Sequence, residues 1–485
     1  MDSERQRAWP TGQFFARFTT NSDAETGRKR YLAFIHHHHL TPITAFLKDV
    51  DNEACVLSEA SLSPKDGTAI AECLKENTKI RILDLSLTGI GPTGCFSIAR
   101  GLLLNSTVTE LNFDSCNCDR QAAAALAQLV HLQSLSLNHN RGAGEAFVHA
   151  LVQEERLSNL HTLKLSRTEF HRPGVLKLLH LFDHARLDQL AHLDLSWNRL
   201  GNHGGARMLI DGLAVWVVGH ELGLEILHLD HNGIVDADVV PEEGPECDTS
   251  GIVLLLKGAS RLRLLGLEHN KLTSISAFAL ANGLCVNKGL WTLAVGHNPI
   301  GFDGAVALMD AMADTTHNQS LCLLRIERAL MEVEDTQKQA SGEEDLFSML
   351  KERAAVTVQK VLTARRAMAD SHEDELGEVE IRKIFESGIK TMFKRAKKNP
   401  RMPRVEYGQP EWTALLSALY HDVRVAAQEK NMLGKAGQLD HALFQLATRA
   451  NDRSFVAGVS FSSFHDEIMH PAVLISGKDD GVTMH

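Results

Sequence analysis

The stretch Leu190-Ala-His-Leu193-Asp-Leu195-Ser-Trp-Asn198-Arg-Leu200 decides the fold of this 485-residue chain. It follows the template L-x-x-L-x-L-x-x-N-x-L, in which alternating leucines are typical of a short strand with one buried side. The same template begins again at Leu224, Leu262 and Leu290. A motif that recurs at a nearly constant spacing predicts an array of similar structural units.

Weaker copies of the template extend this array in both directions. The ten copies begin at residues 52, 80, 108, 132, 160, 190, 224, 262, 290 and 321, at intervals of 28, 28, 24, 28, 30, 34, 38, 28 and 31 residues. Such intervals leave room for a helix after each strand. Residues 277–284 and 304–312 place apolar side chains three and four positions apart, as amphipathic helices do.

From about Asp51 to Met331, this sequence resembles the ribonuclease-inhibitor-like subclass of leucine-rich repeats. The resemblance implies an α/β solenoid, a horseshoe with a parallel sheet inside and helices outside. We therefore expect an array of about ten repeats over residues 51–335. It also implies that the template Asn bonds backbone groups of adjacent turns. That position holds Asn140, Asn198, Asn232, Asn270 and Asn298, with Thr88, Cys116 and Thr168 elsewhere.

The two ends of the chain depart from the template. Residues 1–50 lack it but are rich in apolar side chains, so we expect an N-terminal cap over the exposed end of the solenoid. Residues 341–485 show helical periodicity and predict a small all-α domain. Gly377-Glu-Val-Glu380 and Gly437-Gln-Leu-Asp440 resemble the middle of EF-hand loops, which favours a degenerate EF-hand-like domain. An unrelated helical bundle is the alternative.

Calcium ligands are sparse in these loops. In the loop from His372 to Lys383, Leu376 and Lys383 occupy positions that normally supply oxygen ligands. We therefore predict no cofactor, with calcium as the alternative. Residues 390–404 carry seven bases and are interpreted as a targeting signal, an intramolecular contact or a linker. Residues 235–250 carry six acids and no base, which predicts an inserted acidic loop.

Composition limits the kinds of partner and the cellular compartment that we expect for this chain. Its formal net charge is −11, which argues against nucleic acid as the partner. No apolar run approaches the length of a membrane helix, and the charged N-terminus does not resemble a signal peptide. The eight cysteines lack metal-site spacing, and those on repeat positions are interpreted as small buried hydrophobes. We expect a cytoplasmic protein, with a nuclear or cytoskeleton-associated location as alternatives.

Polar side chains flank the inner leucines, where strand alternation should direct them to the concave face. They are the acids Glu59, Asp84, Glu110, Asp114, Asp194, Asp230, Glu268 and Glu327, the bases Lys164, Arg167, Arg325 and Arg328, and the histidines His139, His192, His228, His231, His269 and His297. In four consecutive repeats the residue before the template Asn is Trp197, His231, His269 and His297, which predicts one column of side chains.

We predict a protein-binding site centred on this column. It comprises Asp194, Trp197, Asp230, His231, Glu268, His269, His297 and Arg328. There are two alternatives. The column residues could be solvated side chains that follow the repeat consensus and bind nothing, or stacked histidines could form a metal site with Asp230 or Glu268. Histidines with an ordinary pKa near ~6.5 would make binding pH-sensitive between about 5.5 and 7.5.

The sequence carries no nucleotide-binding, serine-hydrolase or zinc-protease motif. We therefore expect a non-enzymatic scaffold or adaptor that binds a protein partner with a basic surface, and no membrane. The alternative is a GTPase-activating protein resembling the Ran GTPase-activating family, which uses the same repeat subclass.

Overall fold

The computed structural model describes most of the repeat region. The described residues are 27–154, 158–219, 223–240, 250–314, 320–321, 323–326, 328, 348–350, 352–357, 360, 472–474 and 483–484. The chain divides into two compact units, Met1–Lys271 and Leu272–His485. The boundary lies just before Leu272, the last residue of the eighth copy of the template.

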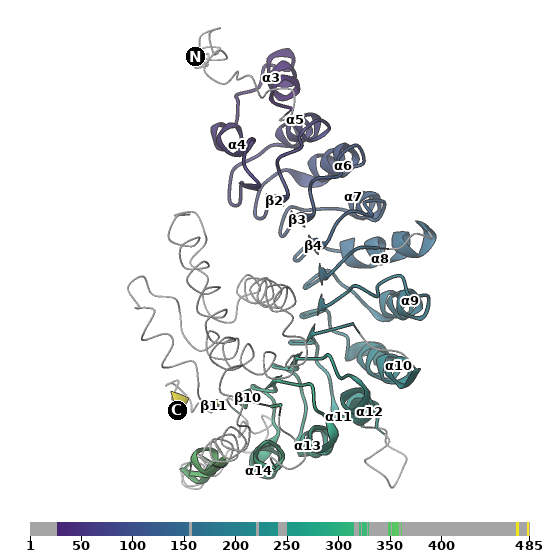
Figure 1. Ribbon diagram of the computed structural model, residues 1–485, viewed down its shortest axis with the longest axis vertical. Coiled ribbons are helices and arrows are strands. Elements are labelled where there is room, and N and C mark those ends of the chain that lie inside the picture. The colour runs from purple at the N-terminus through teal and green to yellow at the C-terminus, as the bar shows by residue number, and fades with distance from the viewer. Residues whose placement is uncertain are drawn as a thin grey trace, which may run out of the picture. The chain divides into compact units, whose positions relative to one another are not determined.

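The first unit contains eight short strands that pair in chain order (Figure 1). They are β1 (Ala54–Val56), β2 (Ile82–Asp84), β3 (Glu110–Asn112), β4 (Ser134–Ser136), β5 (Thr162–Lys164), β6 (His192–Asp194), β7 (Ile226–His228) and β8 (Leu264–Gly266). Every pair is parallel, with Leu83 opposite Leu111 and Leu193 opposite Leu227. Each strand coincides with one predicted copy of the template, so the predicted solenoid fold is confirmed.

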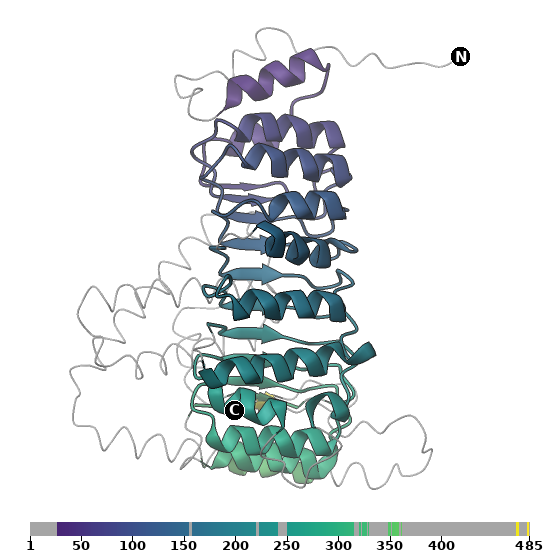
Figure 2. The same cartoon turned by 90° about the vertical axis from the view of Figure 1, so that its right-hand side faces the viewer.

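Helices alternate with these strands and cover one side of the sheet (Figure 2). They are α3 (Arg28–His37), α4 (Thr44–Asp49), α5 (Pro64–Leu74), α6 (Gly91–Leu102), α7 (Arg120–Leu126), α8 (Ala143–Glu154), α9 (Arg172–Asp183), η1 (Asn202–Gly204), α10 (Gly205–Gly219), α11 (Asp236–Val239) and α12 (Gly251–Gly258). The template leucines between the layers, such as Leu193 and Leu195, are fully buried. No single repeat could bury this surface alone, so the stacked repeats form one continuous core.

The template asparagines form the predicted ladder inside the turns. Asn198 is buried and donates to the carbonyls of Leu165 and Leu195 at 2.8 and 3.0 Å. Its side-chain oxygen accepts the N–H groups of Thr168 and Phe170, both at 3.0 Å. Because these backbone groups lie away from water, each bond avoids the cost of an unpaired buried polar group.

The substituted ladder positions make fewer of these bonds. Thr168 donates its hydroxyl to the Leu165 carbonyl of its own repeat at 2.8 Å. Cys116 donates its thiol to the Leu85 carbonyl of the preceding repeat at 2.8 Å. The ladder is therefore most complete from Asn198 onward, as the sequence predicted.

Buried cysteines fill small spaces in the core. Cys55, Cys73, Cys95 and Cys116 are almost fully buried, which confirms their interpretation as hydrophobes; Cys322 lies outside the described residues. Burial raises the pKa of the Cys55 and Cys73 thiols well above the usual range. Thiols that stay protonated are poor nucleophiles, so these side chains serve packing.

From residue 27 onward, where the described part of the chain begins, two helices precede the first strand. Tyr31, Ile35 and Phe46 of α3 and α4 are fully buried, and the Tyr31 hydroxyl accepts the Ile43 N–H at 2.8 Å. The guanidinium of Arg30 donates to the carboxylate of Glu76, just after α5, at 2.8 Å. This apolar segment therefore packs against the start of the array.

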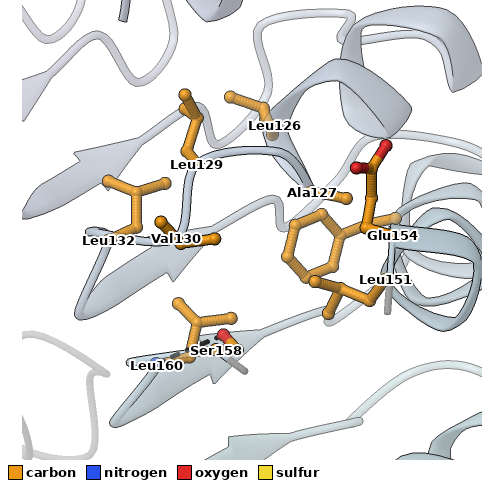
Figure 3. A pocket seen from close by; sticks show the side chains of 10 residues that line it. Leu126, Ala127, Leu129, Val130, Leu132, Leu151, Glu154, Ser158 and Leu160 are labelled. Carbon is orange, nitrogen blue, oxygen red and sulfur yellow. Dashed lines mark hydrogen bonds between the residues drawn. The ribbon is translucent and has the colours of Figure 1, made fainter. Parts of the chain in front are cut away.

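The shortest repeat leaves a small pocket between α7 and α8 (Figure 3). This repeat spans 24 residues from position 108 to 132, and α7 ends at Leu126 after only seven residues. Side chains of Leu129, Phe147 and Leu151 line the space that a longer helix would cover. None of the predicted site residues lines this pocket.

The second unit continues the repeats with β9 (Thr292–Ala294) and β10 (Leu323–Arg325), which pair in parallel, and with α13 (Ser274–Val286) and α14 (Gly301–Ala313). Two strands were not expected in the segment predicted to be helical. β11 (Ala472–Leu474) pairs in parallel with β10, and β12 (Thr483–Met484) pairs antiparallel with β11. Strand β11 supplies hydrogen-bond partners for an otherwise open strand edge, which explains its place in the sheet.

Several predicted features fall outside the described residues. They are the EF-hand-like loops, the basic segment 390–404 and residues 241–249 of the acidic insertion. Residues 348–350 and 352–357 are helical, within the segment predicted to be helical.

Candidate functional site

One backbone conformation marks the residue before the ladder position in every repeat. All ten such residues have a positive φ between 52° and 63°: Glu59, Leu87, Ser115, His139, Arg167, Trp197, His231, His269, His297 and Arg328. Left-handed backbone is uncommon for side chains other than Gly, Asn and Asp. Here it turns the chain sharply where each strand gives way to the next helix. The predicted column therefore lies along the carboxyl edge of the strands, three residues beyond each strand end.

Aromatic rings of the column stack on one another. The rings of Trp197 and His231 lie 3.7 Å apart between centroids, with an angle of 13° between their planes. His231 stacks in the same way on His269, at 3.9 Å and 13°. Both spacings are near van der Waals contact, so the three rings form one continuous stack in the first unit.

The stack ends on Arg167, which the sequence analysis had not placed in the site. Its guanidinium carbon lies 3.9 Å from the centroid of the Trp197 ring. A planar guanidinium over an indole is a favourable cation–π arrangement. Both faces of Trp197 are thus covered, by Arg167 and His231, and its 44% exposure comes from the remaining ring surface. The signal in the sequence was Arg167 itself, which stands at the column position one repeat earlier.

The pKa of His231 departs from the sequence expectation. Burial, and then the charges of His269 and Arg167, lower the pKa of His231 to about 4, although Asp230 acts in the opposite direction. Burial and Arg167 also lower the pKa of His139. His231 is therefore neutral over the window from about 5.5 to 7.5, and the expected pH sensitivity does not arise from this ring.

A second row of polar side chains lies on the strands themselves. Lys164, Asp194 and His228 stand opposite one another on β5, β6 and β7. Nδ1 of His228 lies 3.0 Å from Oδ2 of Asp230, and Oδ1 of Asp230 accepts the Glu268 N–H at 2.7 Å. The predicted acids Asp194, Asp230 and Glu268 are therefore close to the column. Like Asp230, Asp194 also binds a backbone group: its Oδ1 accepts the Ser196 N–H at 2.9 Å.

Two neighbouring histidines of this row titrate in opposite directions. Burial lowers the pKa of His228, but its hydrogen bond to Asp230 and the charges of Asp230, Asp194 and Glu268 outweigh burial, and the net pKa is raised. The pKa of His192 falls well below its usual value because of burial, Lys164 and His228. His192 is 4% exposed and its Nδ1 has no hydrogen-bond partner. Of these two histidines, His228 therefore has the greater proton affinity, and it lies beside the carboxylates.

The remaining predicted site residues, His297 and Arg328, belong to the second unit. Both adopt the same left-handed backbone, and Arg328 is exposed. Among the described residues, no group of three or more His, Cys, Asp or Glu side chains is placed to hold a metal ion. No helix within the described ranges is long and apolar enough to cross a membrane.

A second set of structural asparagines was not predicted from the sequence. Asn77 and Asn105 are buried between a helix and the next strand, and each accepts the N–H of the first template residue, Ile80 or Val108, at 2.8 and 2.9 Å. Asn287 does the same for Leu290 at 2.6 Å. The signal was an Asn three residues before the template. These side chains stabilise the turn on the amino side of the strands.

Comparisons with known proteins agree with this architecture. A family model described as Leucine Rich repeat matches residues 76–99 and 190–208. The ribonuclease inhibitor of Sus scrofa is 24% identical over 292 residues, which cover 55% of this chain and 61% of the relative. NACHT, LRR and PYD domains-containing protein 14 of Mus musculus is 24% identical over 283 residues, covering 55% of this chain and 26% of the relative. The chain thus spans less than two thirds of the length of either curated relative.

Solved structures are also similar to this chain. The C-terminal domain of Caenorhabditis elegans tropomodulin has a TM-score of 0.27 and 15% identity, covering 41% of this chain and 99% of that domain. A chain of the yeast Rad7 and Elc1 complex has a TM-score of 0.34 and 15% identity, covering 66% of this chain and 87% of that chain. The strands, the alternating helices and the asparagine ladder give this chain the fold of a leucine-rich-repeat solenoid, and the family model matches two short stretches of it.

Proposed function

We propose that this chain is a non-enzymatic scaffold that binds a protein partner along the strands and carboxyl edge of its repeats. The observation that carries the proposal is the stack of Trp197, His231 and His269, an exposed aromatic group held rigidly beside Asp230 and Glu268. Tryptophan is enriched among the residues that dominate binding energy at protein interfaces, and a fixed side chain loses little entropy on binding.

The charge on the strand face favours a partner that presents a basic group. Asp194 stands between Lys164 and His228 on neighbouring strands, and the charges of Asp194, Asp230 and Glu268 all act on the His228 imidazole. A partner's Arg or Lys would complement these carboxylates, which sets the orientation of the complex and the rate of encounter. His297 and Arg328 occupy the same template position in the second unit.

This role requires no cofactor, and we place the scaffold in the cytoplasm. The ribonuclease inhibitor that this chain resembles acts, as its name says, on another protein, which supports a protein as the partner of this chain. Single-turnover GTP hydrolysis with a panel of small GTPases checks the alternative function; an acceleration of about 10³-fold would favour a GTPase-activating protein instead.

Affinity capture with paired variants tests the scaffold. Trp197→Ala should lose a captured partner that the wild type retains, whereas Leu87→Ala should keep it. Leu87 is the matched control because it has the same template position and left-handed backbone and is 57% exposed. With the purified partner, Trp197→Ala should weaken binding by about 2 kcal/mol, roughly 30-fold.

Substitutions of the acids on the strands also have a matched control at an equivalent position of an earlier repeat. Asp194→Asn and Asp230→Asn should weaken binding, and Asp84→Asn should not. Asp84 accepts the Ser86 N–H at 2.9 Å, as Asp194 accepts that of Ser196. If none of the site variants differs from its control, the partner binds another surface and the proposed site is wrong.

A further inference from the structure

The carboxyl edge has a charge opposite to that of the whole chain. In the fourth to eighth repeats, the residues directly before and after the ladder position include four bases, Arg141, Arg167, Arg199 and Lys271, and one acid, Glu169, a balance of +3. The formal charge of the entire chain is −11. Because Debye screening limits charge interactions to about 10 Å at ~0.1 M salt, a ligand at the edge meets these exposed bases and the less exposed acids Asp194, Asp230 and Glu268, and not the charge of the whole chain.

These bases differ in whether their charge is already neutralised. Nε of Arg141 bonds the Glu169 carboxylate at 2.8 Å. Arg167, Arg199 and Lys271 are exposed, and within the described part of the chain their side chains have no hydrogen-bond or ion-pair partner. We call Arg167, Trp197, Arg199 and Lys271 the carboxyl-edge strip.

Arg167 is oriented without using its donors. The guanidinium lies over the face of the Trp197 ring, and the left-handed backbone at Arg167 and Trp197 sets both side chains at neighbouring turns. The in-plane N–H groups stay available, in the fork that matches a carboxylate. Because the His231 and His269 rings support Trp197 from its other face, the guanidinium sits on a stack that is already ordered before any ligand arrives.

We propose that the carboxyl-edge strip binds an acidic segment of a protein partner, with Arg167 taking a Glu or Asp carboxylate. The bases lie in the fifth, sixth and eighth repeats, and neighbouring strands are about 4.8 Å apart, a spacing that suits side chains along an extended peptide. A nucleic acid is a long polyanion that would extend beyond the strip and meet repulsion from a chain of net charge −11, whereas a short acidic segment would not. The inference rests on the proposed function only in taking the ligand to be a protein. The carboxyl-edge strip would be a basic site next to the acidic strand face. Contacts of opposite charge at the two sites would fix the orientation of the partner.

Fluorescence anisotropy of the full chain with labelled peptides tests the strip. The probe alternates Gly and Glu; parallel probes carry Lys or phosphoserine in place of Glu. Arg167→Gln should weaken binding of the Glu peptide by about tenfold or more, and Arg141→Gln, an equal change of charge on the same edge, by less than about twofold. Trp197→Leu, which alters no charge, should weaken binding at least about threefold because Arg167 loses its support.

Several results would overturn the proposal. Equal losses of affinity for the Glu peptide in Arg167→Gln and Arg141→Gln would mean that the peptide responds to the overall positive charge of the edge and not to a specific site at Arg167. The same conclusion would follow if Trp197→Leu had no effect. Equal binding of the Lys peptide, or no binding of the Glu peptide, would exclude an acidic ligand, and much tighter binding of the phosphoserine peptide would replace carboxylate by phosphate. If Asp230→Asn abolishes partner capture while Arg167→Gln changes nothing, the scaffold stands and only this strip is wrong.

Discussion

His228 and Asp230 form a hydrogen-bonded pair, with Nδ1 of His228 3.0 Å from Oδ2 of Asp230, and the pair leans over Gly266. A Cβ atom on Gly266 would lie 2.7 Å from Oδ2 of Asp230 and 2.8 Å from Nδ1 of His228. The neighbouring strands carry Lys164, Asp194 and His228 at the equivalent position. The absence of a side chain at Gly266 therefore makes room for the pair.

Substitution Gly266→Ala should displace this pair and weaken its hydrogen bond. Because that bond and the nearby carboxylates hold the pKa of His228 above its usual value, the pKa of His228 should fall. An NMR titration of the imidazole resonances measures the change. Asp230→Asn is the reference variant and should lower the same pKa. An unchanged pKa in Gly266→Ala would mean that the pair adjusts without losing its bond.

Replacing a central ladder residue should destabilise the array strongly. Asn232 is buried, accepts the N–H groups of Asn198 and Leu200 at 2.8 and 3.2 Å, and donates to the Leu195 carbonyl at 3.0 Å. Asn232→Ala leaves the buried N–H groups of Asn198 and Leu200 unpaired, whereas the Leu195 carbonyl keeps its bond from Asn198, so we expect a loss of about 3 kcal/mol in the free energy of unfolding. Urea unfolding measures it. Arg199→Ala, an exposed change, should cost less than about 0.5 kcal/mol.

Trp197 and Leu195 should differ in their contributions to stability. Leu195 is fully buried, so Leu195→Ala should cost about 2–5 kcal/mol. Trp197 is 44% exposed and contacts mainly its stacking neighbours, so Trp197→Ala should cost about 1 kcal/mol or less. Thermal melting of both variants compares them. Similar losses would mean that Trp197 is a core residue and not a binding anchor.

Mild acid should destabilise the stack through His231. Its pKa is about 4 in the folded chain and near 6.5 when unfolded, so the folded state disfavours the proton. Above pH ~6.5 the ring is neutral in both states and has no effect. As the pH falls toward about 4, the unfolded state takes up the proton first and stability is lost.

The variant His231→Gln should remove this component of the acid sensitivity. Denaturant midpoints measured between neutral pH and about pH 4.5 should fall less steeply for the variant than for the wild type. His149→Gln, on the exposed side of α8, is the matched control and should retain the wild-type slope. Identical slopes for all three proteins would contradict the lowered pKa.

The amino-acid sequence by itself determined the repeats, the strands and the ladder. Strand alternation and burial act within a few residues, so Leu193, Leu195 and Asn198 are sufficient to mark one strand and the turn that follows it. Repetition of that pattern then requires neighbouring copies to stack, because none can bury its leucines alone. The column position of Trp197 and His231 followed from the same register.

Only the tertiary structure decided how the column side chains interact. Contact between Arg167 and Trp197, or between Trp197 and His231, joins residues about 30 positions apart, and it depends on a left-handed backbone that their side chains rarely adopt. The neutral state of His231 and the raised pKa of His228 likewise arise from burial and from charges on neighbouring turns. Local pattern fixes which residues share an edge, whereas ring stacking and proton affinity depend on distances and solvent exposure that exist only after the repeats have packed.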